Sequence, residues 1–363
     1  MKIGVPAETL AGEQRVATTP EMVKKLVAKG FEVTIAQGAG VAACYTDADY
    51  TAAGAMIVDQ TTSFSADLVL KVRRPNADEA DLVPAGTVLI SFLEQCGEDA
   101  LIKSMSERGV EVLAVERIPR ISRAQSMDAL SSQSNIAGYR AVIEAAAQYG
   151  RFFPVMMTAA GAAKPARVVV LGVGVAGLQA IATARRLGAD VYAYDVRPET
   201  KEQILSLGAK PIELDLGESG AGEGGYAKEL SAEAKAKQQA ALAEELVKAH
   251  VIITTALIPC RPAPELITEA VVERMREGSV IVDLAAANGG NCKLTQPDQI
   301  VEQHGVRLIG HTNYPSLVAA DASSFYARNL VNLLEIMVEP GEDGLRLKPL
   351  DDDEITRAMR VTG

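Results

Sequence analysis

The sequence predicts an α/β protein made of two doubly wound parallel-sheet (Rossmann-like) domains with a cleft between them. Short apolar strand patterns alternate with helical patterns along most of the chain, which is typical of βαβ units. The length of 363 residues suggests two domains, each with its own core. We expect one domain over 1–130, completed by a C-terminal helix within 321–363, and a second over 131–320.

Composition limits the classes of function. The chain is 48% hydrophobic and 23% charged, as in an ordinary soluble globular protein. A formal net charge of −11 argues against nucleic acid or anionic membrane surfaces as partners. The longest apolar stretch contains glycines and Gln179, so we expect no direct membrane insertion. Four distant cysteines and three histidines show no metal-ligand spacing, and no signal-peptide pattern is present, so we expect no metal and a cytoplasmic location.

The expected first domain has a regular strand and helix rhythm. Its predicted strands are Lys2–Pro6, Phe31–Ala36, Asp67–Val72, Thr87–Phe92 and Val110–Glu116. Helices are expected over Pro20–Lys29 and Glu98–Arg108. No glycine fingerprint opens any of these units, so we do not expect this domain to hold a dinucleotide pyrophosphate.

A polar, serine-rich stretch begins at Arg120 and interrupts the rhythm. It has no strand or helix period and is typical of a functional loop. Ser131 or Ser132 is expected to cap a helix over 133–148 that leads into the second domain. The segment Phe152–Gly161 is expected to be an apolar linker.

The second domain opens on a pattern that indicates a dinucleotide site. An apolar strand, 168–171, runs into a G-x-G-x-x-G turn formed by Gly172, Gly174 and Gly177, and an Ala-rich helix follows. The first glycine permits the tight turn, the second lets a pyrophosphate approach the backbone, and the third lets helix and strand pack closely. The helix N-terminus then offers free N–H groups and a positive dipole end.

Asp195 stands at the end of the next strand, Asp190–Tyr194. Its carboxylate is placed to accept hydrogen bonds from both ribose hydroxyls and would repel a 2′-phosphate, so NAD(H) is favoured over NADP(H). Arg197 is a counterargument, because an arginine there can accommodate that phosphate. A glycine turn with only a structural role is the alternative to a nucleotide site.

The rest of the second domain continues the rhythm, with one break. A loop over 216–228 contains five glycines and is expected to be mobile, or else an ordinary flexible insertion. The predicted elements beyond Asp195 are 201–207, 210–214, Glu229–Ala249, His250–Thr255, Gly278–Leu284, Val306–Ile309 and Ala322–Met337. The charged segment 339–363 is expected to be partly disordered.

Nearly the whole chain resembles the NAD(H)-binding domain I (alpha subunit) of proton-translocating nicotinamide nucleotide transhydrogenase. The resemblance is most specific at Arg120–Ala141, Leu171–Ala182, Gly224–Glu229 and Thr254–Pro259. It implies a homodimeric subunit that passes hydride between NADH and NADP⁺ held by a partner subunit. Proton translocation would be coupled through a membrane-spanning domain on other chains, to which this chain would attach peripherally at the inner membrane.

The resemblance also assigns roles to residues. Arg120, Gln125, Asp128 and Ser131 match a loop beside the nicotinamide, in which Arg and Asp pair, Asp and Ser hold the carboxamide and Gln reaches toward the partner's nucleotide. Spacing alone leaves open a solvated polar loop with a local ion pair. The tyrosine of a loop that closes over nucleotide corresponds to Tyr226. Asp195, Val196 and Arg197 match adenosine-ribose contacts, and the other matched cofactor contacts are Val175, Gly225, Ala256 and Leu257.

Alanine dehydrogenase is a distant relative and gives the first alternative. Arg15 and Lys71 match its pyruvate-binding pair, but Ser91–Gln95 and Ala287–Gly290 stand where its catalytic His and Asp are expected. Oxidising an amine to an imine needs a proton acceptor, so the sequence argues against that reaction. A second alternative is a non-catalytic NAD sensor. Direct transfer between two nicotinamide rings needs position and exclusion of water, and no such acid or base.

Overall fold

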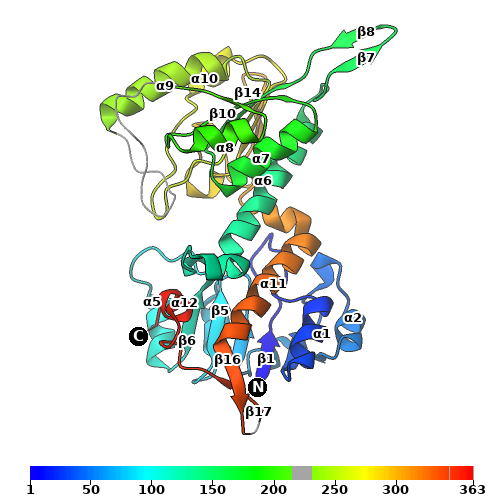
Figure 1. Ribbon diagram of the computed structural model, residues 1–363, viewed down its shortest axis with the longest axis vertical. Helices are drawn as coiled ribbons and strands as arrows, with labels where there is room; N and C mark the ends of the chain where they lie inside the picture. The colour runs from blue at the N-terminus through cyan, green and yellow to red at the C-terminus, as the bar shows by residue number, and fades with distance from the viewer. Residues whose placement is uncertain (215–230, 343, 363) are drawn as a thin grey trace. The chain divides into compact units, whose positions relative to one another are not determined.

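The computed structural model describes residues 1–214, 231–342 and 344–362 (Figure 1). The chain divides into two compact units. Unit 1 comprises Met1–Gln133 and Pro315–Gly363, and unit 2 comprises Ser134–Tyr314. Each unit has its own sheet and its own hydrophobic core.

Unit 1 is built on a six-stranded, fully parallel sheet in the order β3-β2-β1-β4-β5-β6. The strands are β1 (Lys2–Val5), β2 (Glu32–Ala36), β3 (Met56–Val58), β4 (Leu68–Leu70), β5 (Val88–Ser91) and β6 (Glu111–Ala114). This is the strand order of a doubly wound dinucleotide-binding fold.

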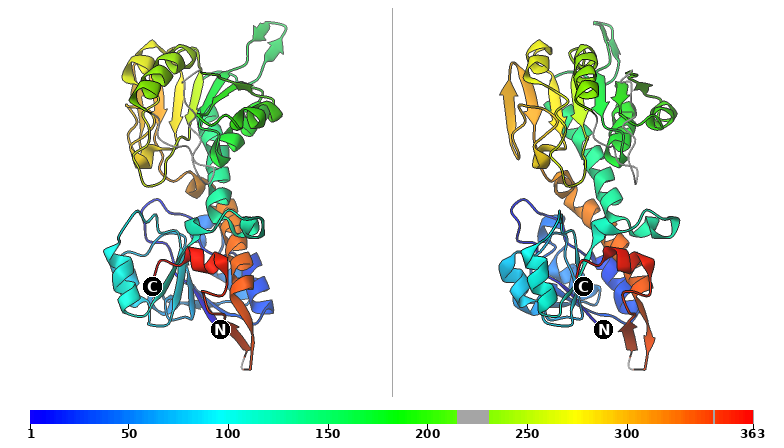
Figure 2. Two further views of the ribbon diagram at one scale, coloured as in Figure 1. Left: turned by 60° about the vertical axis from the view of Figure 1, so that its left-hand side comes forward. Right: turned by 90° about the vertical axis from the view of Figure 1, so that its left-hand side faces the viewer.

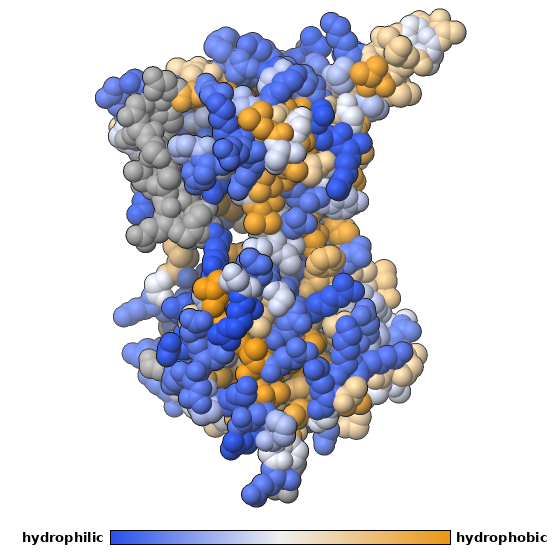
Figure 3. Space-filling view, viewed as in Figure 1, coloured by the Kyte–Doolittle hydropathy of each residue, from blue (hydrophilic) through white to orange (hydrophobic). Residues whose placement is uncertain are grey.

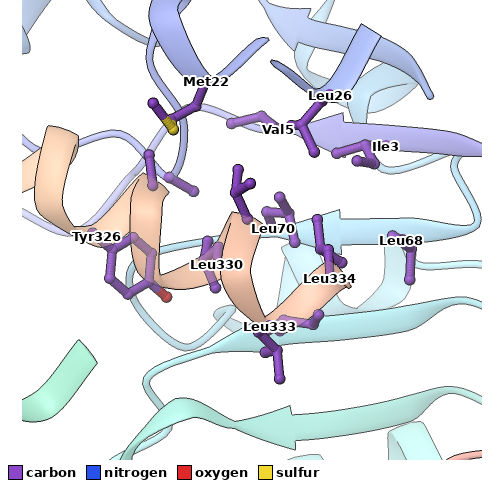
Figure 4. Packing of buried hydrophobic residues seen from close by; sticks show 14 of the residues in the cluster. Ile3, Val5, Met22, Leu26, Leu68, Leu70, Tyr326, Leu330, Leu333 and Leu334 are labelled. Carbon is purple, nitrogen blue, oxygen red and sulfur yellow. The ribbon is translucent and has the colours of Figure 1, made fainter. Parts of the chain in front are cut away.

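Helices cover both faces of this sheet, as the alternation of buried residues requires. Along β4, Leu68 and Leu70 face the cluster formed with α1 (Pro20–Ala28) and α11 (Ala319–Met337), shown in Figure 4. Val69 faces the opposite cluster, which includes residues of α4 (Ala77–Leu82) and α5 (Ala100–Glu107). Two short helices, α2 (Asp47–Ala52) and α3 (Gln60–Ser63), complete the connections before β4.

Unit 2 contains a seven-stranded sheet in the order β11-β10-β9-β12-β13-β15-β14, parallel except for the last strand. The strands are β9 (Arg167–Leu171), β10 (Asp190–Tyr194), β11 (Lys210–Pro211), β12 (Val251–Thr254), β13 (Val280–Asp283), β14 (Ile300–Gln303) and β15 (Val306–Ile309). Each of β9, β12 and β13 divides its buried residues between the clusters on the two faces.

The helices of unit 2 lie on opposite faces of this sheet (Figure 2). Helices α6 (Ala129–Gln148), α7 (Val175–Arg186) and α8 (Thr200–Ser206) contribute to one apolar cluster, and α9 (Ala232–Leu246) and α10 (Glu269–Arg274) contribute to the other. The predicted α/β class of two doubly wound parallel sheets is thereby confirmed.

The segment after Arg120 is more regular than expected. Residues Ser122–Met127 form a 3-10 helix, η3, and α6 begins at Ala129, earlier than predicted. The carboxylate of Asp128 accepts the N–H of Ser131 at 2.9 Å, so the aspartate caps the helix and the serine lies in its first turn. The prediction of a serine cap was therefore wrong.

The predicted apolar linker is instead an antiparallel hairpin of β7 (Met156–Thr158) and β8 (Gly161–Ala163). Pairing of the two strands satisfies the backbone groups on their facing edges, and the outer edges face solvent. Its surface is mainly apolar (Figure 3), and Met157 is 76% exposed.

The C-terminal segment is folded against unit 1. It forms β16 (Val338–Gly341), β17 (Gly344–Leu347) and α12 (Glu354–Met359). Ile355 and Met359 are fully buried in the core of that unit. The expectation of partial disorder was wrong for 339–342 and 344–362, because a charged segment with a few well-spaced apolar residues can still pack one face.

Candidate functional site

The glycine turn after β9 has the geometry that its spacing predicts. Gly172 has a φ of +89°, and a Cβ there would lie 2.7 Å from Oγ1 of Thr255. A Cβ on Gly177 would lie 1.9 Å from the carbonyl oxygen of Gly172, so only glycine allows α7 to pack this closely. A Cβ on Gly174 would have no heavy atom within 4 Å. The space beside the Gly174 backbone is therefore open, and its assignment to a pyrophosphate stays a prediction.

Helix α7 begins at this open position. Gly174 is its N-cap residue in extended conformation and provides no side-chain cap, so the first-turn N–H groups and the positive dipole end remain available for an anion. Val175 at the first position is 38% exposed. These features fit the phosphate groups of a dinucleotide.

Asp195, directly after β10, is tied to the glycine turn and to Arg197. Its Oδ2 accepts the N–H of Val173 at 2.7 Å, and its Oδ1 accepts the backbone N–H of Arg197 at 2.9 Å. The Arg197 guanidinium donates Nε to Oδ1 and Nη2 to Oδ2, both at 2.9 Å. These side-chain hydrogen bonds hold the pKa of Arg197 above its ordinary value. Val196 between them is partly buried against the apolar cluster of that sheet face.

The loop after β12 approaches the same turn, at the point where the strand order reverses between β9 and β12. The Thr255 hydroxyl donates to the carbonyl of Gly172 at 2.9 Å. Leu257 is 39% exposed. Ala256 and Leu257, both predicted cofactor contacts, therefore follow a residue that contacts the glycine turn directly.

Asn291 is a site-organising residue that sequence reasoning missed. It is fully buried, and its side-chain amide forms hydrogen bonds with both the N–H and the carbonyl of Ala256. Asp283 at the end of β13 fixes the residue that follows Asn291, because its carboxylate accepts the N–H of Cys292 at 3.0 Å. The available signal was the Asn that ends the glycine-rich stretch before Cys292, since a buried Asn needs several hydrogen-bond partners.

The predicted nicotinamide loop belongs to unit 1. Ser131 donates its hydroxyl to Oδ2 of Asp128 at 2.5 Å, so these two predicted residues are in contact. Arg120 and Gln125 are exposed in the same segment. The structure does not describe 215–230, so Gly225 and Tyr226 lie outside the described residues.

Two asparagines of α11, Asn329 and Asn332, hold this loop. Each donates its side-chain amide to the carbonyl oxygen of Ser126 at 2.9 Å. Oδ1 of Asn329 also accepts the Ser132 hydroxyl at 2.7 Å. Sequence reasoning missed this pair, although two amides three residues apart on an otherwise apolar helix face were a usable signal.

Arg15 and Lys71 lie buried in unit 1, where each is paired with carboxylates of the same chain. Arg15 donates Nε and Nη2 to the two oxygens of Glu13, at 2.8 and 2.6 Å. Lys71 lies 3.3 Å from Glu8 and 3.1 Å from Glu79. Burial alone would raise the pKa of Glu13, but the hydrogen bonds and charge of Arg15 lower it to about 2. Burial raises the pKa of Glu8 above its ordinary value, against the opposing charge of Lys71.

Each unit has a sheet with the strand order of a dinucleotide-binding fold, and in unit 2 the glycine turn is hydrogen-bonded to Asp195. These features define an α/β protein of the dinucleotide-binding class. The chain belongs to the alanine dehydrogenase/PNT family. The model of the family's N-terminal domain matches 4–137, and that of its C-terminal domain matches 141–362.

Several known proteins are similar over most of their length. The first part of the NAD(P) transhydrogenase subunit alpha of Rhodospirillum rubrum is 53% identical over 98% of this chain and 95% of that protein. A transhydrogenase structure from Sinorhizobium meliloti aligns with a TM-score of 0.84 and 45% identity, covering 93% of this chain and 94% of that one. Alanine dehydrogenase of Bacillus subtilis is 30% identical over 88% of this chain and 80% of that enzyme. The predicted resemblance is confirmed.

In the described part of the chain, no helix is both long enough and apolar enough to cross a membrane.

Proposed function

We propose that the chain is the NAD(H)-binding subunit of a proton-translocating transhydrogenase. Unit 2 would hold NAD(H) through Gly174, the N-terminus of α7 and Asp195. The Asp128–Ser131 pair would hold the carboxamide, which needs both a donor and an acceptor. Hydride would pass directly to NADP⁺ on a partner subunit, so these residues bind, orient and exclude water.

The observation that favours transfer between nucleotides over amino-acid oxidation is the pairing of Arg15 and Lys71. A 2-oxo acid needs cations for its carboxylate, yet Arg15 is held by Glu13 through two hydrogen bonds and Lys71 by Glu8 and Glu79. Displacing these carboxylates would leave buried charges without partners, which is costly. The expected His and Asp are absent from the two stretches: Glu94, the carboxylate in the first, is paired with Arg73, and Asn288 in the second has no basic group.

Reconstitution tests this proposal. The chain is mixed with an NADP⁺-loaded partner domain of a transhydrogenase, and NADH oxidation and NADPH formation are followed together. A parallel reaction contains the chain alone with NADH, pyruvate and ammonium. We expect turnover only in the mixture. Turnover by the chain alone would replace this proposal with an alanine dehydrogenase, and tight NADH binding without turnover in either reaction would indicate a sensor.

The physiological assembly follows from the same proposal. The chain would act as a homodimer, peripheral on the inner membrane through the NADP(H)-binding and membrane-spanning subunits on other chains. Sedimentation of the chain at monomer mass over a wide concentration range would contradict the homodimer.

A further inference from the structure

The carboxylate of Asp195 has no acceptor position left for a ribose. A carboxylate offers about four lone-pair positions. The N–H of Val173 and the backbone N–H of Arg197 take two of them, and Nε and Nη2 of Arg197 take the other two. Both side chains are largely buried, with 6% of Asp195 and 11% of Arg197 exposed.

Only the guanidinium can give way to a ligand. The Val173 and Arg197 N–H groups belong to the backbone just beyond β9 and β10, two strands whose parallel register comprises five residue pairs. The Arg197 side chain is instead bound to Asp195 only through its terminal guanidinium group. The charge of Glu199, an exposed residue nearby, also raises the pKa of Arg197. A rotation of this side chain therefore opens both oxygens of Asp195 at once.

We propose that Arg197 determines nucleotide specificity by competing with the adenosine ribose for Asp195. The two ribose hydroxyls would replace Nε and Nη2 when NAD(H) binds. While Arg197 is hydrogen-bonded to Asp195 (the closed pair), its guanidinium cannot bind a 2′-phosphate. Asp195 therefore excludes NADP(H) in two ways, by the repulsion of its own charge and by holding Arg197. This inference rests on the NAD(H) site of the proposed function.

The pairing has a calculable effect on affinity. When only a fraction of the protein has the open pair, the apparent dissociation constant is the intrinsic constant divided by that fraction. The pair is bidentate and charge-assisted, which favours the closed state. An open fraction of about one tenth would weaken binding about tenfold.

The first test removes the competing donors. Arg197→Met has no donor on its side chain, and Arg197→Lys keeps the charge but has no planar fork to span both oxygens. The chain alone is titrated with NADH, with ADP and with 2′-deoxy-ADP. We expect Arg197→Met to bind NADH and ADP about tenfold more tightly, with Arg197→Lys in between. The gain should be smaller for 2′-deoxy-ADP, which lacks one hydroxyl.

Unchanged or weaker NADH binding by Arg197→Met would overturn the competition, because Arg197 would then be inert or a direct ligand. Equal gains for ADP and 2′-deoxy-ADP would show that the 2′-hydroxyl is not part of the exchange. Thermal unfolding of each variant checks that it is folded, and Arg197→Lys carries the test if Arg197→Met is not.

The second test releases the guanidinium. Asp195→Asn removes the charge that holds Arg197, so the ratio of NADPH to NADH affinity should rise about tenfold or more, as expected for a freed phosphate-binding arginine. The double variant Asp195→Asn, Arg197→Met should lose that gain in NADPH affinity. No rise in the ratio, or NADPH binding by the double variant as tight as by Asp195→Asn, would overturn the sequestration of Arg197.

These are binding measurements on one chain, so they are independent of hydride transfer. Failed reconstitution with intact affinity shifts would reject the proposed function and leave this inference standing. Successful reconstitution with no affinity shift would do the reverse.

Discussion

The side-chain amide of Asn291 makes both backbone hydrogen bonds of Ala256. Its Oδ1 accepts the Ala256 N–H at 3.1 Å, and its Nδ2 donates to the Ala256 carbonyl at 2.9 Å and to that of Pro264 at 2.8 Å. Asn291 therefore takes the place of a neighbouring strand just beyond β12. It fixes a loop that carries two predicted cofactor contacts.

Asn291→Ala should lower both stability and nucleotide affinity. Loss of three buried hydrogen bonds predicts a free energy of unfolding lower by about 2–4 kcal/mol. NADH should bind more weakly because Ala256 and Leu257 lose their fixed position. Denaturant unfolding and NADH titration measure the two effects. Asn288→Ala is the matched control, since Asn288 is exposed in the same stretch and should change neither quantity by much.

Gly174 and Gly177 separate binding from packing. Gly174→Ala places a methyl group in open space, so stability should fall by no more than about 1 kcal/mol at this N-cap position while NADH affinity drops sharply. Gly177→Ala forces a Cβ to within 1.9 Å of a backbone oxygen and should severely destabilise the fold. Equal NADH affinity in wild type and Gly174→Ala would count against a pyrophosphate at this turn.

The Glu13–Arg15 pair predicts a pH dependence of stability. The folded pKa of Glu13, about 2, lies below the ordinary value of 4.5, so its contribution is present above about pH 4.5 and is lost as the pH falls toward 2. The shift corresponds to about 3 kcal/mol. Glu13→Gln should therefore be less stable than wild type at pH 6 by about that amount, and the difference should shrink at pH 2–3. The charge of Glu13 also contributes to the raised pKa of Glu8, so the comparison is repeated in a Glu8→Gln background. A constant difference across this range would contradict the assignment.

Asn329 and Asn332 should position the predicted nicotinamide loop through Ser126. Asn332→Ala removes one of the two amides on that carbonyl, so hydride transfer in the reconstituted system should slow several-fold with a smaller change in NADH affinity. Arg328→Ala, on the same helix but paired with Glu21, is the control and should leave transfer unchanged. An equal loss in both variants would mean that α11 matters only for stability.

The regular parts of the fold could be predicted from the sequence because local pattern fixes them. β10 and β15 have the predicted bounds, and their alternation and apolar runs depend on burial in a parallel sheet. The missed elements depend on tertiary contacts. β3 has three residues and is held by pairing with β2, and α12 forms where Ile355 and Met359 meet the core of unit 1.

In the candidate site, too, the residues fixed by local conformation could be predicted, and the residues fixed by tertiary contacts could not. Gly172 and Gly177 could be predicted because their conformations and close contacts allow no other residue. Asn291 could not be placed from spacing, since its partners, Ala256 and Pro264, lie more than twenty residues earlier in the chain. The opposite charges of Asp195 and Arg197 are evident in the sequence. The sequence could not show that the guanidinium donates to both oxygens of the carboxylate, because that depends on the side-chain geometry.

The most direct test of the central proposal is isotope transfer. NADH carrying deuterium at the transferred position of C4 is mixed with the chain and an NADP⁺-loaded partner domain in ordinary water, and the NADPH formed is analysed by mass spectrometry. We predict that the NADPH carries the deuterium without loss to solvent, because hydride passes directly between the two rings. NADPH without the label, or no NADPH while NADH binds normally, would contradict the account.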